Sequence, residues 1–347
     1  MSIITNKEGK EYILKEALGG GAFGTVYEAN DKYGNKYAIK QIIIKDPNHI
    51  QMFLNEINVL KKLSSSPNCH QDIVCIYDSI YDRFHNIIYV VMELIDGDTL
   101  YVGSIKPSEK LLKSCSETLS FIHSKKLVHR DIKPQNIMIT KQGKIKFVDF
   151  GTGCSIAEDP NIDICKGTAG TDRFLDPRFF IGEINTACRS SDIYALGATF
   201  YMLMTEENPP HYVLVDVYDQ QGLYYEVLSK LETTKYSEKL KKIVGAMLNP
   251  GSTRPSSDEI ITFLNGGELT LNGYDGPEIC QTKISPIDKS MIDIIFESVL
   301  ELKKTDEELE LDVSTSEEYI KLAIDQFEEK GITVPEGTFD LVLKKLN

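Results

Sequence analysis

Two carboxylates and a carboxamide lie within a short stretch in the middle of the chain. Asp131 and Asn136 are five residues apart, and Asp149 follows Asp131 by 18 residues, behind the run KIKFV. That run predicts a short strand, so the three side chains would stand on loops that flank a small β-ribbon. Such oxygens are the ligands that Mg²⁺ prefers, and a carboxylate can also orient an attacking hydroxyl. Together they indicate phosphoryl transfer, although each Asp alone is equally typical of a loop cap.

A glycine-rich segment near the start, LGGGAFGTVY, places Gly19, Gly21 and Gly24 in the spacing G-x-G-x-x-G. Dinucleotide-binding folds use the same spacing, but their chain continues from it directly into a helix. Here TVY continues as a predicted strand. Glycines between two strands predict a hairpin whose backbone can lie close to phosphates.

Lys40 ends a second predicted strand, KYAIK, and Glu56 is the acidic residue inside the predicted helix over residues 52–63. A buried lysine needs a charged partner to keep its proton. We therefore expect a Lys40–Glu56 ion pair that holds an ammonium ready for triphosphate oxygens. The alternative is a surface lysine whose ammonium lies in water.

The remaining pattern predicts an α+β chain. Strands are expected at YILKEAL, TVYEA, KYAIKQIII and IIYVVMEL, interrupted by the helix over 52–63. After Gly97 the apolar residues recur at helical spacing in KLLKSCSETLSFIHS, SSDIYALGATFYMLM and EKLKKIVGAMLN.

Along the chain the glycine-rich segment, Lys40, Glu56, the stretch around Asp131 and Asp149 follow one another. In this order and spacing they resemble the motifs of the eukaryotic-type protein kinase family over residues 12–265. The resemblance implies the bilobal protein-kinase fold, with a β-rich N-lobe over 12–93 after an extension over 1–11. A hinge over 93–97 and a mainly helical C-lobe over 98–265 would follow.

The resemblance also implies roles for the matching residues. Lys40 would contact the α- and β-phosphates of ATP while paired with Glu56. Asp131 would orient the substrate hydroxyl and accept its proton. Asn136 and Asp149 would hold Mg²⁺, with Mn²⁺ as the alternative ion. The other ATP-binding positions would belong to the glycine-rich loop, the adenine pocket and the hinge: Leu18, Gly19, Gly20, Gly21, Gly24, Val26, Ala38, Met92, Glu93, Ile95 and Met138.

Two residues favour Ser/Thr specificity. Lys133, two residues after Asp131, matches the pattern of Ser/Thr-specific members and would neutralise the γ-phosphate. Thr171 matches the threonine of the substrate-binding loop. Asp96 and Asp98 would bind ribose hydroxyls or a substrate arginine, or else be solvated loop carboxylates.

Arg130 precedes Asp131, at the position where the family often binds a phosphorylated activation-loop residue. Thr168 is the first candidate for that phosphorylation and Ser155 the second. The alternative is that Arg130 meets only backbone carbonyls. His129 and Phe150 are interpreted as structural residues, and Asp192 is expected to accept backbone N–H bonds near His129 and Arg130.

The seven cysteines show no C-x-x-C spacing. An odd number without such spacing favours reduced, mostly buried thiols in an intracellular, cytoplasmic protein. Redox regulation through Cys154 and Cys165 is the alternative.

The sequence departs from the family at one place. Asp176-Pro177-Arg178 stands where the family has Ala-Pro-Glu, whose Glu forms a buried ion pair with a distant arginine, here Arg254. Two buried arginines facing each other would be costly. We predict that Asp176 pairs with Arg254 and that Arg178 points to solvent or to Glu183.

The last part of the chain carries most of the net charge of −14. From residue 266 onward there are 19 Asp and Glu against 8 Lys, a charge of −11, which leaves −3 for the first 265 residues. This argues against nucleic acid as a partner. No apolar run is long enough for membrane insertion. A linker over 266–285 and an acidic helical extension over 286–347 are expected, with apolar stripes that include Val299, Ala323, Phe339, Val342 and Leu343.

The extension would dock on the catalytic lobe or bind a separate partner. For the whole chain we expect transfer of the ATP γ-phosphoryl group to Ser/Thr hydroxyls of protein substrates. A pseudokinase that uses the fold only for binding is the main alternative. Kinases of small molecules lack the substrate loop around Thr171 and the pattern Asp192-x-Tyr194-x-x-Gly197 found here.

Overall fold

The computed structural model describes most of the chain up to residue 273 and isolated positions beyond it. By contact the chain divides into two compact units, Met1–Pro177 with Thr186–Glu278, and Arg178–Asn185 with Ile279–Asn347. The described residues are 2–21, 24–45, 50–101, 105–157, 159, 162–165, 168–180, 184, 186–211, 220–250, 253–273, 299, 320, 321, 323, 324, 339, 342 and 343.

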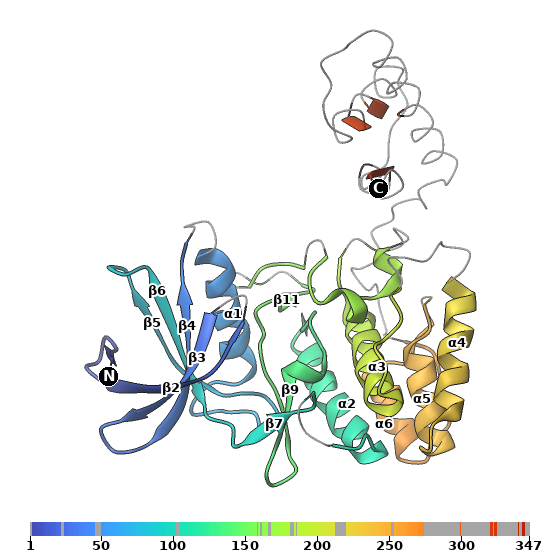
Figure 1. Ribbon diagram of the computed structural model, residues 1–347, viewed down its shortest axis with the longest axis horizontal. Helices are drawn as coiled ribbons and strands as arrows, with labels where there is room; N and C mark the ends of the chain where they lie inside the picture. The colour runs from blue at the N-terminus through green and yellow to red at the C-terminus, as the bar shows by residue number, and fades with distance from the viewer. Residues whose placement is uncertain are drawn as a thin grey trace. The chain divides into compact units, whose positions relative to one another are not determined.

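The first unit begins with a six-stranded antiparallel sheet in the order β1-β2-β3-β4-β6-β5 (Figure 1). Residues of alternating strand positions, among them Tyr12, Ala29, Ile39 and Val91, form its core. Its strands are β1 (Ile3–Thr5), β2 (Glu11–Gly21), β3 (Gly24–Asp31), β4 (Lys36–Ile43), β5 (Ile76–Asp82) and β6 (Ile87–Glu93).

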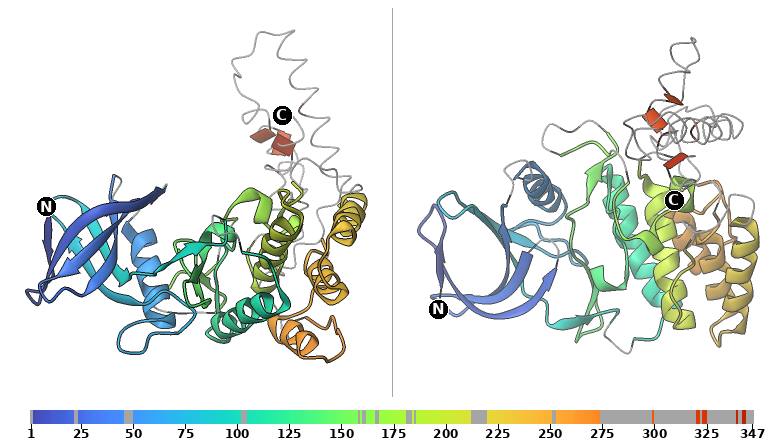
Figure 2. Two further views of the ribbon diagram at one scale, coloured as in Figure 1. Left: turned by 60° about the horizontal axis from the view of Figure 1, so that its bottom comes forward. Right: turned by 45° about the horizontal axis from the view of Figure 1, so that its top comes forward.

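Helix α1 (Ile50–Leu63) lies between β4 and β5 in the sequence. Its apolar residues Phe53, Ile57, Leu60 and Leu63 recur at three- and four-residue steps, and all four are buried. This one-sided pattern gives the helix an apolar face for packing and leaves its lysines exposed. The helix lies beside the sheet in both views of Figure 2.

Two small ribbons lie between the sheet and the main helices of this unit. One has the order β10-β9-β7, and the other pairs β11 with β8. Each strand has only two to four residues, and most of their apolar side chains, such as Val128, Ile137 and Phe147, are buried. Their bounds are β7 (Gly97–Thr99), β8 (Leu127–Val128), β9 (Ile137–Thr140), β10 (Ile145–Phe147) and β11 (Cys154–Ser155).

The rest of the first unit is helical, as the sequence predicts. Ser108 caps α2 through its side chain, and Ser256 with Glu259 forms a capping box on α6. Helix α3 is buried almost all round, because apolar and small residues occupy every face. Helices α4 and α6 were not predicted from the sequence pattern. The helices are α2 (Glu109–Ser124), α3 (Arg189–Thr205), α4 (Gln220–Thr233), α5 (Glu238–Met247) and α6 (Ser257–Leu264).

The predicted helical extension is described at only a few positions. Val299, Ala323 and Val342, members of the predicted apolar stripes, are helical and fully buried. Phe339 and Leu343 are helical as well, and the other members of the stripes lie outside the described residues. In the described part of the chain, no helix combines the length and apolarity that a membrane crossing needs.

Candidate functional site

The glycine-rich segment forms the predicted hairpin. β2 and β3 pair antiparallel, with Gly19 opposite Val26, Gly20 opposite Thr25 and Gly21 opposite Gly24. Gly24 has a φ of +143°, and a Cβ there would lie 2.2 Å from the carbonyl oxygen of Gln41. Only glycine fits this close approach of backbone to backbone.

The hairpin covers a cleft of about 730 Å³ that brings together nearly all the residues singled out from the sequence. Gly21 is absent from its lining among the described residues, and Leu60, Val74, Leu94, Thr99, Val148 and Phe174 line it although no motif pointed to them. The predicted residues that line it are Leu18, Gly19, Gly20, Gly24, Val26, Ala38, Lys40, Glu56, Met92, Glu93, Ile95, Asp131, Lys133, Asn136, Met138, Asp149 and Thr171.

Lys40 joins the sheet to α1 at one wall of the cleft. Its Nζ lies 2.7 Å from Oε1 of Glu56 and 3.1 Å from Oδ1 of Asp149. Burial acts to lower the pKa of Lys40, but the two carboxylates outweigh it and the net pKa is raised. Burial likewise acts to raise the pKa of Asp149, and the Lys40 ammonium reverses this, so that the pKa of Asp149 is lowered. The ammonium and the Asp149 carboxylate are therefore both charged at neutral pH.

Asp131 is held at the opposite wall by three side chains. Its Oδ1 accepts a hydrogen bond from the Thr171 hydroxyl at 2.7 Å, and its Oδ2 accepts one from Nδ2 of Asn136 at 2.9 Å. Nζ of Lys133 lies 2.7 Å from the same Oδ2 and donates to the Thr171 hydroxyl at 2.7 Å. The carboxylate is thus oriented in a closed network that includes one cation.

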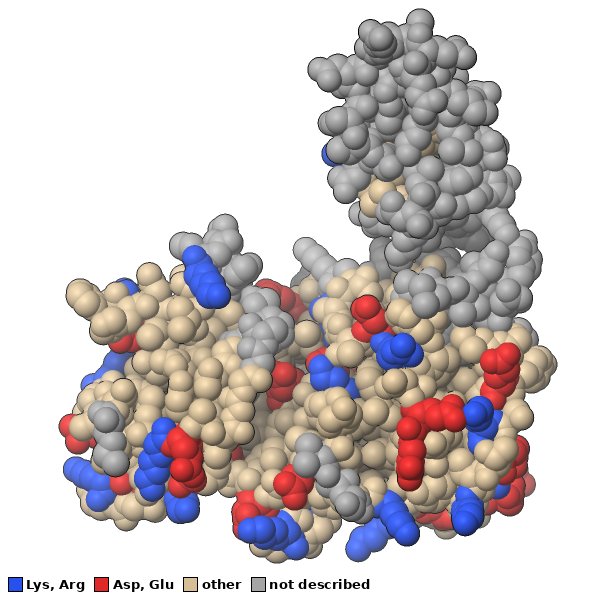
Figure 3. Space-filling view, viewed as in Figure 1, with Lys and Arg blue, Asp and Glu red and all other residues tan. Residues whose placement is uncertain are grey.

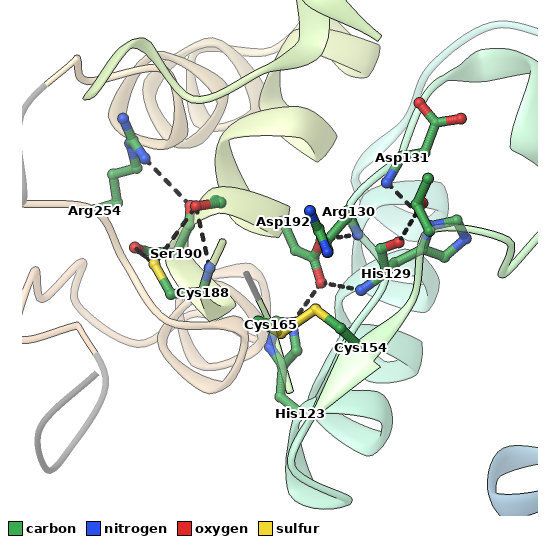
Figure 4. Close-up of polar contacts among 12 residues, drawn as sticks. His123, His129, Arg130, Asp131, Cys154, Cys165, Cys188, Ser190, Asp192 and Arg254 are labelled. Carbon is green, nitrogen blue, oxygen red and sulfur yellow. Dashed lines mark hydrogen bonds and ion pairs between the residues drawn. A yellow bond between two sulfur atoms is a disulfide. The ribbon is translucent and has the colours of Figure 1, made fainter. Parts of the chain in front are cut away.

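The backbone that carries Asp131 is fixed by Asp192 of α3. The Asp192 carboxylate accepts hydrogen bonds from the backbone N–H groups of His129 and Arg130, each at 2.9 Å, which confirms the prediction for this residue (Figure 4). Nε2 of His123 lies 3.0 Å from the same carboxylate, a contact that the sequence did not reveal. Burial acts to raise the pKa of Asp192, but these partners prevail and the pKa is lowered.

Asn136 and Asp149 offer suitable oxygens for a magnesium ion. The Asn136 amide nitrogen donates to the backbone oxygen of Asp131 at 2.8 Å and to its Oδ2 at 2.9 Å, so the amide carbonyl oxygen is the end available to a hard cation. Asp149 has a φ of +59° and its side chain is 38% exposed in the cleft. A carboxylate and an amide oxygen are a donor set that Mg²⁺ uses together with phosphate oxygens and water.

The model for the protein kinase domain matches residues 12–263, well over half of the chain. The chain belongs to the protein kinase family. The β-rich region with α1 is accordingly its N-lobe, and the helical region its C-lobe.

Several relatives of the chain are named as Ser/Thr protein kinases. A probable serine/threonine-protein kinase of Dictyostelium discoideum is 34% identical over 214 residues, which is 59% of this chain and 41% of that protein. PknB of Mycolicibacterium smegmatis is 32% identical over 57% of this chain and 33% of its own length. PrkC of Bacillus subtilis is 32% identical over 57% and 31%. The chain therefore covers less than half the length of these curated relatives.

The departure from Ala-Pro-Glu is resolved as the charge argument predicts. Nη1 and Nη2 of Arg254 bind the two carboxylate oxygens of Asp176, at 2.5 and 3.0 Å, and both side chains are fully buried. The prediction of an Asp176–Arg254 pair is confirmed. The prediction that Arg178 points to solvent is wrong, because Arg178 is only 3% exposed. Glu183, its alternative partner, lies outside the described residues.

The two candidate phosphorylation sites of the activation segment differ in exposure. Thr168 is exposed. Ser155 is 1% exposed, and its hydroxyl donates to the carbonyl oxygen of Ala157 at 2.6 Å and lies 3.3 Å from that of Lys126. Ser155 is therefore a poor site in this conformation, because its hydroxyl is bonded and shielded from another kinase.

The prediction of reduced cysteines is wrong for four of them. Cys69 is bonded to Cys75 and Cys154 to Cys165, while Cys115 and Cys188 are buried cysteines outside these two disulfides, and Cys280 lies outside the described residues. The sequence spacing gave no sign of either bond. Cys154 and Cys165 meet because Ser155 donates its N–H to the Asp163 carbonyl and accepts from the N–H of Cys165, each at 2.9 Å.

Proposed function

We propose that the protein is a Ser/Thr protein kinase that transfers the γ-phosphoryl group of ATP to protein hydroxyls. The observation that carries the proposal is the orientation of Asp131 by Thr171, Lys133 and Asn136 in the cleft that Lys40 and Asp149 also line. A binding module needs none of these groups in this arrangement. The Ser/Thr kinases among the relatives support the same function.

Asp131 is suited to act on the substrate hydroxyl. In the proposed reaction the hydroxyl oxygen forms a bond to the γ-phosphorus while the bond from that phosphorus to the bridging oxygen of ADP breaks. The hydroxyl proton passes to the Asp131 carboxylate. Lys133, whose Nζ lies 2.7 Å from that carboxylate, neutralises charge on the phosphoryl oxygens.

The nucleotide would occupy the cleft beneath the glycine hairpin. Val26, Ala38 and Met138 offer apolar surface to the adenine, and Glu93 and Ile95 offer hinge backbone groups to its edge. The side chain of Glu93 is itself held by Lys146 at 2.7 Å, which keeps it from the adenine. Lys40 would bind the α- and β-phosphates. Asn136 and Asp149 would hold Mg²⁺, which would supply positive charge to the phosphate oxygens.

Several finer assignments remain predictions. They are the protein substrates, the cytoplasmic location, the phosphorylation of Thr168 with binding to Arg130, and the domain boundaries drawn from the sequence. On the face of the molecule in Figure 3, Lys and Arg are interspersed with Asp and Glu over the described residues, in keeping with protein rather than nucleic-acid partners.

The acidic extension over 286–347 is proposed to dock on the catalytic lobe. A chain that ends at about residue 280 would then lose thermal stability or change its phosphoryl-transfer rate. If both properties are unchanged while binding to another protein is lost, the extension is a separate partner-binding module.

The function is tested by an isotope-transfer assay. The full chain, radiolabelled ATP, Mg²⁺ and a generic protein substrate should give labelled phosphoserine and phosphothreonine. Asp149→Ala should abolish transfer, because the variant lacks one of the two side chains that would hold Mg²⁺ at the phosphates. Glu117→Gln on the exposed face of α2 serves as a control for the loss of one negative charge.

A parallel nucleotide-binding measurement separates the alternatives. Binding of ATP without transfer by the wild-type chain would identify a pseudokinase. Label on tyrosine would reject the Ser/Thr assignment, and transfer to small molecules alone would reject the protein substrate.

A further inference from the structure

The disulfide between Cys154 and Cys165 lies at the base of the activation segment. Cys154 follows the Asp149-Phe150-Gly151 motif and belongs to β11, where it pairs with Val128, the residue before His129. Cys154 is 2% exposed and Cys165 is 3% exposed. Figure 4 shows the bond near the loop that carries His129, Arg130 and Asp131. The proposed phosphoryl transfer does not use either sulfur.

The disulfide joins two arms of the activation segment, one at Gly153–Cys154 and the other at Asp163–Cys165. Asn55 of α1 also joins these two arms. Nδ2 of Asn55 donates to the carbonyl oxygen of Gly153, next to Cys154, at 2.8 Å. Oδ1 of Asn55 accepts from the N–H of Asp163, two residues before Cys165, at 2.7 Å. Asn55 is 6% exposed, so losing either bond would leave a buried polar group without its partner.

Asn55 is adjacent to Glu56, which holds Lys40 at 2.7 Å. The arm at Gly153 also packs directly on α1, since a Cβ at this glycine would lie 3.1 Å from Cγ1 of Val59. The position of Glu56 therefore depends on contacts that α1 makes with both arms. Because both contacts go to one side chain, they require the arms to keep a fixed separation.

We propose that the Cys154–Cys165 disulfide is a thiol-sensitive site that controls phosphoryl transfer through Asn55, an inference that rests on the proposed kinase function. The closed bond, together with the backbone hydrogen bonds from Ser155 to Asp163 and from Cys165 to Ser155, holds the arms at the separation that Asn55 bridges. Opening it restores the conformational freedom of the loop between the cysteines. Asn55 then binds the arms less often, α1 is less firmly held, and Glu56 pairs with Lys40 less often. The oxidised protein is thus the more active form.

The chemistry is thiol–disulfide exchange with a small thiol such as glutathione. A thiolate attacks one sulfur of the bond, forms a mixed disulfide and releases the other cysteine as a thiolate, which takes up a proton. A second thiol attacks the mixed disulfide and releases the remaining cysteine. The protein gains two electrons and two protons, and two glutathione molecules leave as one molecule of glutathione disulfide. An excess of glutathione disulfide drives the reverse reaction, which closes the protein disulfide again. The burial of both cysteines makes the exchange depend on opening of the segment.

The test uses the full chain equilibrated in glutathione buffers of different reduction potential. Alkylation and mass spectrometry assign the state of each disulfide. Phosphoryl transfer and hydrogen exchange of residues 50–63 are then measured on the same samples. Reduction of Cys154–Cys165 should lower transfer about fivefold or more and speed exchange in α1, because loop closure of this length is a substantial constraint.

Matched variants separate this bond from the other. Cys165→Ser should transfer phosphate slowly in every buffer, and its rate should no longer depend on the reduction potential. Cys154→Ser provides a second measurement if one variant fails to fold. Cys69→Ser removes the Cys69–Cys75 bond and should respond as the wild type does. Asn55→Ala should keep the Cys154–Cys165 bond by mass spectrometry yet lose the response, which identifies Asn55 as a positioning residue.

The outcomes distinguish this inference from the function on which it rests. Absence of transfer in all buffers, with the change in α1 exchange intact, would reject the kinase function and leave the coupling standing. Equal or higher transfer after reduction, or an Asn55→Ala variant that responds like the wild type, would overturn the inference. Failure of the bond to form in any buffer would overturn it too.

Discussion

The kinase domain contains two buried ion pairs with different surroundings. Lys40 and Glu56 line the cleft, their side chains are 11% and 4% exposed, and Asp149 shares the ammonium. Arg254 and Asp176 are fully enclosed. There the guanidinium also donates to the carbonyl oxygens of Asn249 at 2.6 Å, Ser190 at 3.3 Å and Pro250 at 3.4 Å.

The difference shows what each pair is for. In the enclosed pair the donors and acceptors are satisfied within the protein, so its contribution is to the fold. In the cleft pair the ammonium faces space that a ligand can enter, so its contribution is to binding and transfer. In a pair that only supports the fold, the carboxylate can come from a different position. The family's motif has it at the position of residue 178, whereas Asp176 supplies it here. A catalytic pair cannot change in this way, because its ligand fixes its position.

Among the ion pairs, the largest effect on transfer is expected at the cleft pair. Lys40→Met should lower phosphoryl transfer by about 10²-fold or more, because a preorganised cation for the phosphates is lost. It should also lower stability, since Glu56 is left buried without its cation. Adding Glu56→Leu should recover stability but not transfer. Recovery of transfer in the double variant would contradict the role given to Lys40, and the isotope assay with thermal unfolding measures both.

The enclosed pair should show the reverse. Asp176→Asn removes the charge with little change of shape and should cost about 3–5 kcal/mol of unfolding free energy, because Arg254 is left without its carboxylate. Transfer per folded molecule should change by less than about threefold, since the other hydrogen bonds described for the pair go to Ser190, Ser191, Asn249 and Pro250, none of which lines the cleft. Denaturant unfolding measures the loss.

A double variant provides the control for that loss. Asp176→Leu with Arg254→Met should regain most of the stability, because a buried ion pair is replaceable by apolar side chains. If the double variant is as unstable as Asp176→Asn, the cost lies in packing rather than in the unpaired charge.

The smallest effect is expected at an exposed pair. Nζ of Lys230 lies 2.7 Å from Oε1 of Glu207, and both side chains are 52% exposed. Glu207→Gln should leave the unfolding midpoint and the transfer rate unchanged within error, because solvent screens such pairs. A clear loss of stability would show that proximity alone, and not burial, determines what an ion pair contributes.

Much of the site could be predicted because its chemistry lies in short motifs. The residues from His129 to Asn136 are close in sequence, and their spacing alone places Asp131 near Lys133 and Asn136. The Asp176–Arg254 pair was also predictable, because a buried arginine requires a carboxylate and one stood nearby in the motif. The exposure predicted for Arg178 was wrong, because the general preference of arginine side chains for solvent does not indicate how one particular position is packed.

Contacts made only by tertiary structure could not be predicted. The Cys154–Cys165 bond depends on backbone hydrogen bonds around Ser155, and cysteine spacing does not encode them. The contact of His123 with Asp192 joins α2 to α3 across 69 residues. Leu60, Val74 and Val148 line the cleft as ordinary apolar residues, and nothing in their type distinguishes them from the core.

The central claim, that Asp131 serves transfer to a Ser/Thr hydroxyl, is tested most directly by Asp131→Asn. Labelled ATP and a protein substrate should give phosphoserine and phosphothreonine with the wild type. The variant should be slower by roughly 10²–10⁴-fold, with ATP binding and the unfolding midpoint retained, because only the carboxylate is lost. Transfer at the wild-type rate by Asp131→Asn, or no transfer by the wild type, would contradict the account.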